Sequence, residues 1–154
     1  MINQKGFTLL ETLIYITLFT VIIGGGIVAV YQIIQSTDAS YSHIILQEEA
    51  NFLFRKIDWA ATGADSINVG SSTLEVSKPS TTLTFAQEGD NLTLQGIPLN
   101  SESIIVSSVS FVKTDPVGEK PASVTSNFTL TTEQNNWPAT QNFSFTKYLR
   151  KVSP

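Results

Sequence analysis

An uncharged apolar stretch near the N-terminus limits the possible folds of this chain more than any other feature. Residues 12–37 form a run of 26 positions without a charged side chain. As an α-helix, this run reaches about 39 Å, which exceeds a bilayer hydrocarbon core of about 30 Å. It is also longer than the roughly 7–15-residue apolar core of a secretory signal. We therefore expect a helix that stays in the membrane.

The charges on either side of the stretch indicate its orientation. Lys5 precedes it, and the next charge after it is Asp38. The positive-inside rule places the end that carries Lys5 in the cytoplasm. The expected protein is a single-pass protein of the cytoplasmic (inner) membrane with an extracytoplasmic C-terminal part.

Composition excludes several functions. The 154-residue chain has no cysteine, a net charge of −4 and no run of Lys or Arg. Disulfides, thiolate catalysis and an extensive nucleic-acid surface are therefore not expected. The single histidine, His43, has no evident nucleophile beside it and is interpreted as a surface residue. We predict no catalytic residue, no cofactor and no metal site.

The helical pattern continues beyond the apolar stretch but becomes amphipathic. Two neighbouring stripes recur at spacings of three and four residues, as expected for a helix with one buried face. Gly63 is a plausible stop. The apolar stripe is Leu46, Ala50, Leu53, Ile57, Ala60 and Ala64, and the polar stripe is Glu48, Asn51, Arg55, Asp58, Thr62 and Asp65.

The remainder of the chain has a residue pattern that is typical of β-strands. Alternating and β-branched runs predict a small, mainly antiparallel sheet with one polar face, and its apolar face requires a cover such as the stripe. The fold class is therefore α+β, with a long N-terminal helix packed against a β-domain. The predicted strands are residues 74–76, 81–85, 92–94, 104–112, 124–132 and 143–148.

Two turns contain acidic side chains, and two tryptophans stand out. Glu88, Asp90 and Asn91 share one turn, and Asp115 lies in another. Oxygen ligands of this type suit calcium. Ordinary turn chemistry also explains them and is the preferred interpretation. Trp59 and Trp137 are expected as core or edge residues, with a possible contact role for Trp137.

The residues from Lys5 to Glu11 form a specific motif. They read Lys-Gly-Phe-Thr-Leu-Leu-Glu, after a short polar leader and before the apolar run. This combination resembles the class III leader of type IV prepilins and type II secretion pseudopilins. The resemblance implies cleavage between Gly6 and Phe7 by a membrane aspartyl peptidase, and methylation of the new amine of Phe7. It divides the chain into residues 1–6 (leader), 7–37 (membrane or filament-core helix), 38–64 (amphipathic continuation) and 65–154 (β-rich domain).

Glu11 needs a partner because a carboxylate in an apolar membrane segment costs roughly 2.5–3.5 kcal/mol. Cleavage after Gly6 would create a positive amine on Phe7, four residues earlier. The family resemblance implies that Glu11 meets this amine on a neighbouring subunit and fixes the axial register. The amine could also meet Glu11 within one chain. Alternatively, the positive N-terminal end of the helix stabilises the carboxylate.

Three consecutive glycines interrupt the apolar segment. Gly24, Gly25 and Gly26 each cost a helix roughly 1 kcal/mol relative to Ala. One interpretation is close packing of neighbouring helices against a backbone without side chains. The other is helix flexibility, with a weak point at which the helix stretches in a packed filament.

Residues 47–60, followed by a small β-domain, resemble minor pseudopilins of the J-like class. The chain also lacks the C-terminal cysteine pair of many major pilins. The resemblance implies a structural, non-enzymatic subunit of a type IV pilus-like or pseudopilus filament. Its implied partners are other pilin or pseudopilin subunits, prepilin peptidase, an inner-membrane assembly platform and membrane lipid. The alternatives are a surface pilin for adhesion or DNA uptake, and a membrane-tethered ligand-binding domain or enzyme that never assembles.

Overall fold

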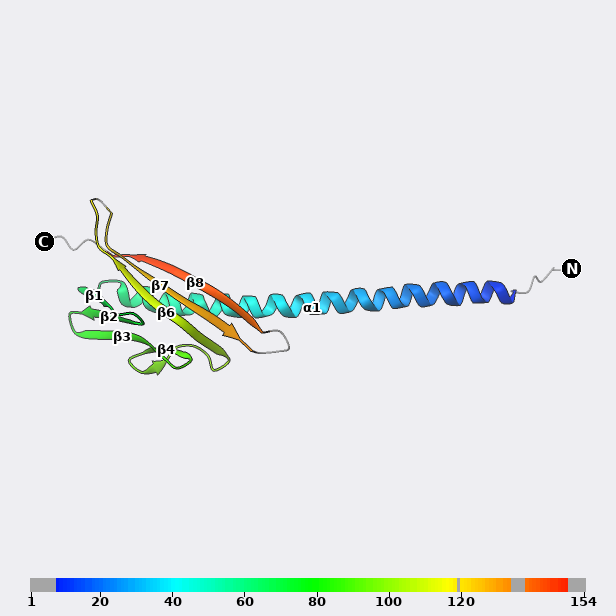
Figure 1. Cartoon of the computed structure of the whole chain (residues 1–154), viewed down its shortest axis with the longest axis horizontal. Helices are drawn as coiled ribbons and strands as arrows, with labels where there is room; N and C mark the ends of the chain where they lie inside the picture. The colour runs from blue at the N-terminus through cyan, green and yellow to red at the C-terminus, as the bar shows by residue number, and fades with distance from the viewer. Residues whose placement is uncertain (1–7, 119, 134–137, 150–154) are drawn as a thin grey trace. The chain divides into compact units, whose positions relative to one another are not determined.

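The structure is a computed structural model that describes residues 8–118, 120–133 and 138–149. The chain divides into two compact units, residues 1–38 and 39–154. Helix α1 (Leu9–Ala61) begins in the first unit and ends in the second, which also contains all the strands (Figure 1). The α+β class predicted from the sequence is confirmed. We describe the two units separately.

In the first unit, α1 is an apolar helix with exposed side chains. It is long and apolar enough to span a membrane by length and composition. Threonine hydroxyls of this segment bond to the helix itself: the Thr17 hydroxyl donates to the Leu13 carbonyl at 2.8 Å, and the Thr20 hydroxyl donates to the Ile16 carbonyl at 2.8 Å. These bonds satisfy hydroxyl groups that would otherwise face hydrocarbon without a partner.

In the second unit, α1 buries the predicted stripe. Beyond the end of the helix, Ala64 is half-buried against the same core, and the polar stripe is exposed apart from a half-buried Asp58. Gly63 has a φ of +72°, the left-handed conformation that commonly follows a helix C-terminus. The five stripe residues within α1 are at most 1% exposed: Leu46, Ala50, Leu53, Ile57 and Ala60.

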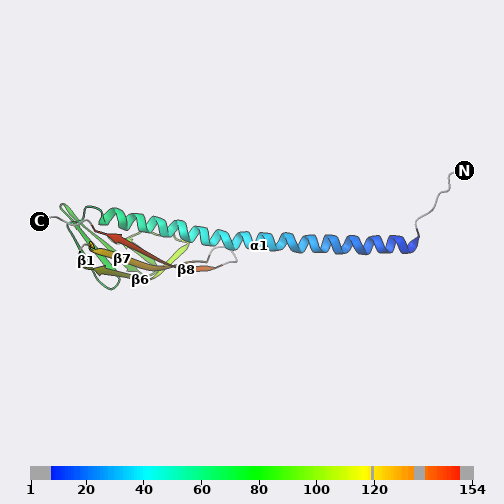
Figure 2. The ribbon, with the colours of Figure 1, turned by 90° about the horizontal axis from the view of Figure 1, so that it is seen from above.

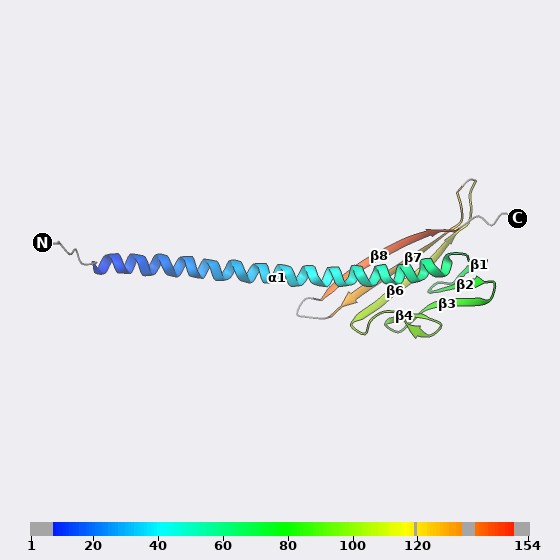
Figure 3. The same ribbon diagram turned by 180° about the vertical axis from the view of Figure 1, so that it is seen from behind.

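The strands form two antiparallel sheets instead of the single sheet expected from the sequence. The first sheet has the order β1-β2-β3-β4-β5, and the second has the order β6-β7-β8 (Figure 3). In Figure 2, the part of α1 that belongs to this unit lies along one side of the strands. The strands are β1 (Ser66–Val69), β2 (Thr73–Lys78), β3 (Thr81–Glu88), β4 (Asn91–Leu94), β5 (Ile97–Pro98), β6 (Ile104–Thr114), β7 (Ser123–Thr132) and β8 (Ala139–Tyr148).

A bulge in β6 explains its interrupted alternation. Val106 and Val109 are both buried although three positions separate them, which would place them on opposite faces of a regular strand. The pairing with β7 shifts register between Ser107 and Ser110, and Ser108 adopts a φ of 52°. Because the bulge adds one residue to β6, the inward-facing positions before and after it lie on the same side of the sheet. The apolar residues on both sides of the bulge therefore face the core.

Two tight turns shape the first sheet. The β3–β4 hairpin pairs Glu88 with Asn91, and Gly89 in the turn has a φ of 59°, as a type II′ turn requires. The β4–β5 hairpin turns through Gln95 and Gly96, whose φ values of 54° and 78° fit a type I′ turn. The sequence predicted the first hairpin with a wider turn and missed the second one.

An aromatic cluster joins α1 to the second sheet. The Phe54 ring centroid lies 4.8 Å from that of Phe128, 5.0 Å from Phe145 and 6.5 Å from Phe143. Beside it, the Lys147 ammonium lies 2.6 Å from the Asp58 carboxylate. This packing supplies the cover that the apolar face of the sheet requires.

Two side-chain amides connect the sheets. The buried Asn100 accepts a hydrogen bond from the Leu92 N–H at 3.0 Å and donates to the Ile104 carbonyl at 2.7 Å. The side-chain oxygen of Gln87, Oε1, accepts a hydrogen bond from the Val109 N–H at 3.1 Å. These side chains, together with a backbone hydrogen bond from the Val106 N–H to the Asp90 carbonyl at 2.9 Å, join β6 to the first sheet where no strand-to-strand ladder exists.

Candidate functional site

The first turn of α1 is the described part of the predicted processing and assembly site. Gly6 and Phe7 lie outside the described residues. Thr8 precedes the helix, and its hydroxyl oxygen accepts a hydrogen bond from the Glu11 N–H at 3.3 Å. Its carbonyl accepts from the N–H groups of Glu11 and Thr12 at 3.0 and 3.2 Å. Thr8 is therefore the N-cap of α1.

The carboxylate of Glu11 lies three residues after this cap. Threonine followed by glutamate at that spacing is the capping-box pattern, which places the carboxylate near the unpaired N–H groups of the first turn. The Tyr15 hydroxyl donates to Glu11 Oε1 at 3.3 Å. The geometry suits a carboxylate that is held in place and can receive a cation. Sequence reasoning overlooked Thr8, although the Thr-x-x-Glu spacing contained the signal.

The three glycines lie in an uninterrupted part of α1. A methyl group added at Gly24, Gly25 or Gly26 would meet nothing within 4 Å. The fold of the single chain therefore does not require glycine at these positions. The two interpretations, close packing of neighbouring helices and helix flexibility, both remain predictions about an assembly.

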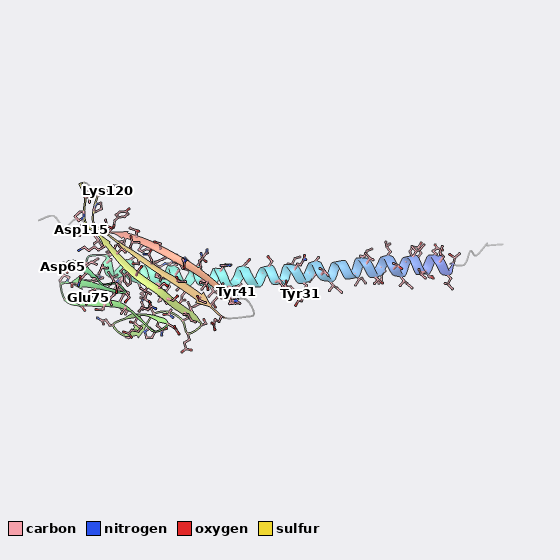
Figure 4. The ribbon with its side chains drawn as sticks, viewed as in Figure 1. Tyr31, Tyr41, Asp65, Glu75, Asp115 and Lys120 are labelled. Atoms are coloured by element: carbon pink, nitrogen blue, oxygen red, sulfur yellow. The ribbon has the colours of Figure 1, made fainter. Side chains whose placement is uncertain are left out.

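The other candidate chemical groups do not converge. His43 is exposed on α1. Asp115 lies in the connection between β6 and β7 (Figure 4), whereas Glu88 is the last residue of β3 and Asp90 lies in the β3–β4 turn. Within residues 8–118, 120–133 and 138–149, no group of three or more His, Cys, Asp or Glu side chains has the geometry to hold a metal ion.

Trp59 lies elsewhere than expected. It was predicted as a core or edge residue, but its side chain is 57% exposed on α1. Lys78 of β2 donates to the Trp59 carbonyl at 3.2 Å, and its ammonium lies 4.8 Å from the centre of the indole ring. The cation thus supports the last turn of the helix and leaves much of the indole accessible. Trp137 lies outside the described residues.

Comparison with known proteins supports the interpretation of the N-terminus. Residues 1–27 match the family model of the prokaryotic N-terminal methylation motif. No match was found among curated proteins or among solved structures. The motif and the apolar helix that follows it support a type IV prepilin-like protein of a structural class, anchored in a membrane by a single pass. A protein of this class is a substrate for a prepilin-type peptidase.

Proposed function

We propose that this protein is a structural subunit of a type IV pilus-like or type II secretion pseudopilus filament. The observation that carries the proposal is the methylation motif at residues 1–27, continued by a helix whose apolar residues up to position 34 are exposed or half-buried in the single chain. Such a helix can exchange lipid for the helices of neighbouring subunits. The β-unit then lies outside the helical core of the filament.

Processing and pairing form the proposed mechanism. Cleavage between Gly6 and Phe7 releases a positive amine that is methylated. Glu11, fixed in the first turn by the Thr8 cap, receives this amine from a neighbouring subunit. Pairing offsets the cost of a carboxylate in an apolar environment and fixes the axial register. The N-terminus is cytoplasmic before assembly, and the inner-membrane platform moves the subunit into the filament.

We further propose that the protein is a minor subunit similar to the J-like pseudopilins. The resemblance of residues 47–60 and the small β-unit without cysteine support this assignment. Those residues form the last turns of α1, which contain Leu53, Phe54 and Ile57 of the core contact. The assignment predicts co-purification with other pseudopilin subunits.

N-terminal sequencing of the mature protein tests the proposal. In cells with an active prepilin peptidase, we expect a mature chain that begins with methylated Phe7. Replacing Gly6 with a bulky residue, Gly6→Leu, should leave the chain unprocessed. A mature chain that begins at Met1 in such cells would refute the prepilin assignment.

A matched pair of variants tests the role of Glu11. Glu11→Ala removes the carboxylate, whereas Thr8→Ala removes the capping hydroxyl, worth about 1 kcal/mol, and keeps the carboxylate. If Glu11 pairs with an amine, Glu11→Ala should be processed but absent from filaments, and Thr8→Ala should assemble. Equal loss in the two variants would instead favour stabilisation by the helix N-terminus.

A further inference from the structure

Strand β8 forms a long, open edge of the second sheet. Its partner is β7, and the register between the two strands runs without interruption over all ten residues of β8. No other strand accompanies β8 on the side away from β7 (Figure 1, Figure 3). Across the part of the chain that the structure describes, no further backbone hydrogen bond reaches residues 139–148. One row of backbone N–H and C=O groups on β8 therefore lacks a backbone partner.

The pairing with β7 identifies the groups in this row. The Leu149 N–H donates to the Ala122 carbonyl at 2.8 Å, and these two residues continue the β7–β8 register by one position. In an antiparallel pair, alternate positions exchange hydrogen bonds with the partner strand, and the positions between them direct their N–H and C=O groups away from it. Odd-numbered residues of β8 therefore bond to β7. The even-numbered residues face the open edge: Thr140, Asn142, Ser144, Thr146 and Tyr148.

The other edges of the two described sheets are protected, whereas most of β8 is not. β1 has four residues, and β5 has two and ends in Pro98. β6 has a bulge and is joined to the first sheet by side-chain amides. Short strands, prolines, bulges and charges are the features that keep sheet edges from pairing. β8 contains no proline and one charged residue, Lys147, which lies near its end beside Asp58, so residues 139–146 have none of these features.

The side chains beside this edge specify what can bind there. On the inner face, Phe143 and Phe145 are only half-buried, with ring centroids 6.5 and 5.0 Å from that of Phe54. An apolar side chain placed next to these rings would remove more of their surface from water. On the outer face, the even-numbered residues of β8 are exposed and uncharged. A strand that fits this edge therefore alternates apolar and uncharged polar residues.

We infer that the β8 edge binds an extended segment of another protein, which adds an antiparallel strand to the second sheet. Its apolar residues lie on the inner face beside the Phe143 and Phe145 rings, and its uncharged polar residues lie on the outer face. Main-chain hydrogen bonds to the even-numbered residues of β8 supply affinity, and the rings supply selectivity. The contact goes beyond the proposed filament role, because it uses neither Glu11 nor the apolar segment of α1.

A second copy of this chain does not fit the edge. Antiparallel pairing of β8 with another β8 requires a two-fold axis normal to the sheet. The last turns of α1 lie along one side of the strands (Figure 2), so this axis would reverse the direction of α1 in the second copy. Copies anchored in one membrane by the same N-terminal segment share one direction. The occupant is therefore a different protein.

Two matched peptides test this geometry with the full chain in detergent. The probe is a fluorescent peptide as long as β8, in which Thr and Val alternate between terminal lysines. In the expected register, its Thr amides bond to β8 and its Val amides point away from β8. Methylation of the Val amide nitrogens should leave binding intact and also keep the probe from pairing with itself. Methylation of the Thr amide nitrogens should weaken binding at least about tenfold, because it removes the donors that β8 accepts.

Fluorescence anisotropy measures both affinities. We expect saturable binding of the Val-methylated peptide below about 1 mM. A peptide of the same composition with its apolar residues side by side should bind more weakly, because they cannot all face the two rings. Equal affinity of the Val-methylated and Thr-methylated peptides, equal affinity of the rearranged peptide, or no saturable binding in this range would each overturn the inference.

Ser144 provides a matched pair of variants of the protein itself. Its N–H faces the open edge, so Ser144→Pro keeps the hydrogen bonds to β7, and proline is tolerated at such positions. The ring removes one donor from the edge, and affinity for the Val-methylated peptide should fall about tenfold. Ser144→Thr keeps the N–H and should bind like wild type. A Ser144→Pro chain with a wild-type urea midpoint and unchanged affinity would contradict the inference. The methylated peptides test the unaltered chain and do not depend on how this variant folds.

The mass of the solubilised chain tests the excluded occupant. Ser144→Pro should leave this mass unchanged. A dimer that Ser144→Pro dissociates and Ser144→Thr preserves would place a second copy on the edge and overturn the inference. N-terminal sequencing reports on the proposed function separately: chains that begin at Met1 in cells with active peptidase would refute the prepilin assignment without altering the peptide affinities.

Discussion

The aromatic contact between α1 and the second sheet should dominate the stability of the β-unit, and one pair of variants tests this. Phe54→Ala removes a ring that lies within 6.5 Å of three other ring centroids. Phe52→Ala removes the same side chain two positions earlier, where the ring points away from the core and is 42% exposed. The two substitutions are chemically identical and differ only in the face that they alter.

The expected effects follow from burial. Truncation of a fully buried Phe costs about 3–5 kcal/mol, so the half-buried Phe54 should cost about 2–3 kcal/mol. The Phe52 ring lies 5.4 Å from the Lys56 ammonium on the exposed face of α1, so Phe52→Ala should stay within about 0.5 kcal/mol of wild type.

Urea unfolding of the full chain in detergent, followed by tryptophan fluorescence, measures the difference. With an m-value of about 2 kcal/mol/M, Phe54→Ala should lower the unfolding midpoint by about 1–1.5 M. An equal shift for the two variants, or a negligible shift for Phe54→Ala, would refute the claim that this cluster holds the helix on the sheet.

Two further predictions concern Asn100 and the glycine triplet. Asn100→Ala leaves the Leu92 N–H and the Ile104 carbonyl without their amide partner and should reduce the free energy of unfolding by about 2–3 kcal/mol; an unchanged urea midpoint would show that the amide connection is dispensable. Changing residues 24–26 to alanine should leave the unfolding of the β-unit unchanged, because the added methyl groups meet nothing within 4 Å in the single chain. The same change should impair filament assembly or extension. Unaltered filaments would contradict both interpretations of the triplet.

The helix was well predicted because its signals are local. Spacings of three and four residues identified the buried stripe, and Gly63 marked the end of the helix where a positive φ is needed. Tertiary packing agrees with these local signals, so the sequence alone was sufficient to predict the buried face of the helix and its end. The exposure of Trp59 was not predictable from residue type, since a tryptophan is usually buried in part.

The sheets were predicted less well because their division depends on distant contacts. Ser66–Val69 has only two apolar residues and gains its strand partner from Thr73–Lys78. Gln95 adopts a positive φ that non-glycine residues seldom show, which concealed the second hairpin. The bulge at Ser108 reverses the alternation within one strand, and no local pattern reveals that Asn100 joins two sheets.

The candidate site shows the same contrast. The motif around Phe7 could be recognised from the sequence because its residues are contiguous. The Thr8 cap was equally local and was missed, although threonine three positions before glutamate is a known helix start.

The amide connections through Gln87 and Asn100 have a consequence for biogenesis. They join two sheets by hydrogen bonds and not by a disulfide, in a chain that has no cysteine. Folding of the β-unit therefore needs no oxidant and no disulfide isomerase, and its rate is not limited by thiol chemistry that takes seconds to hours. The unit can reach its native state at the redox potential of either side of the membrane.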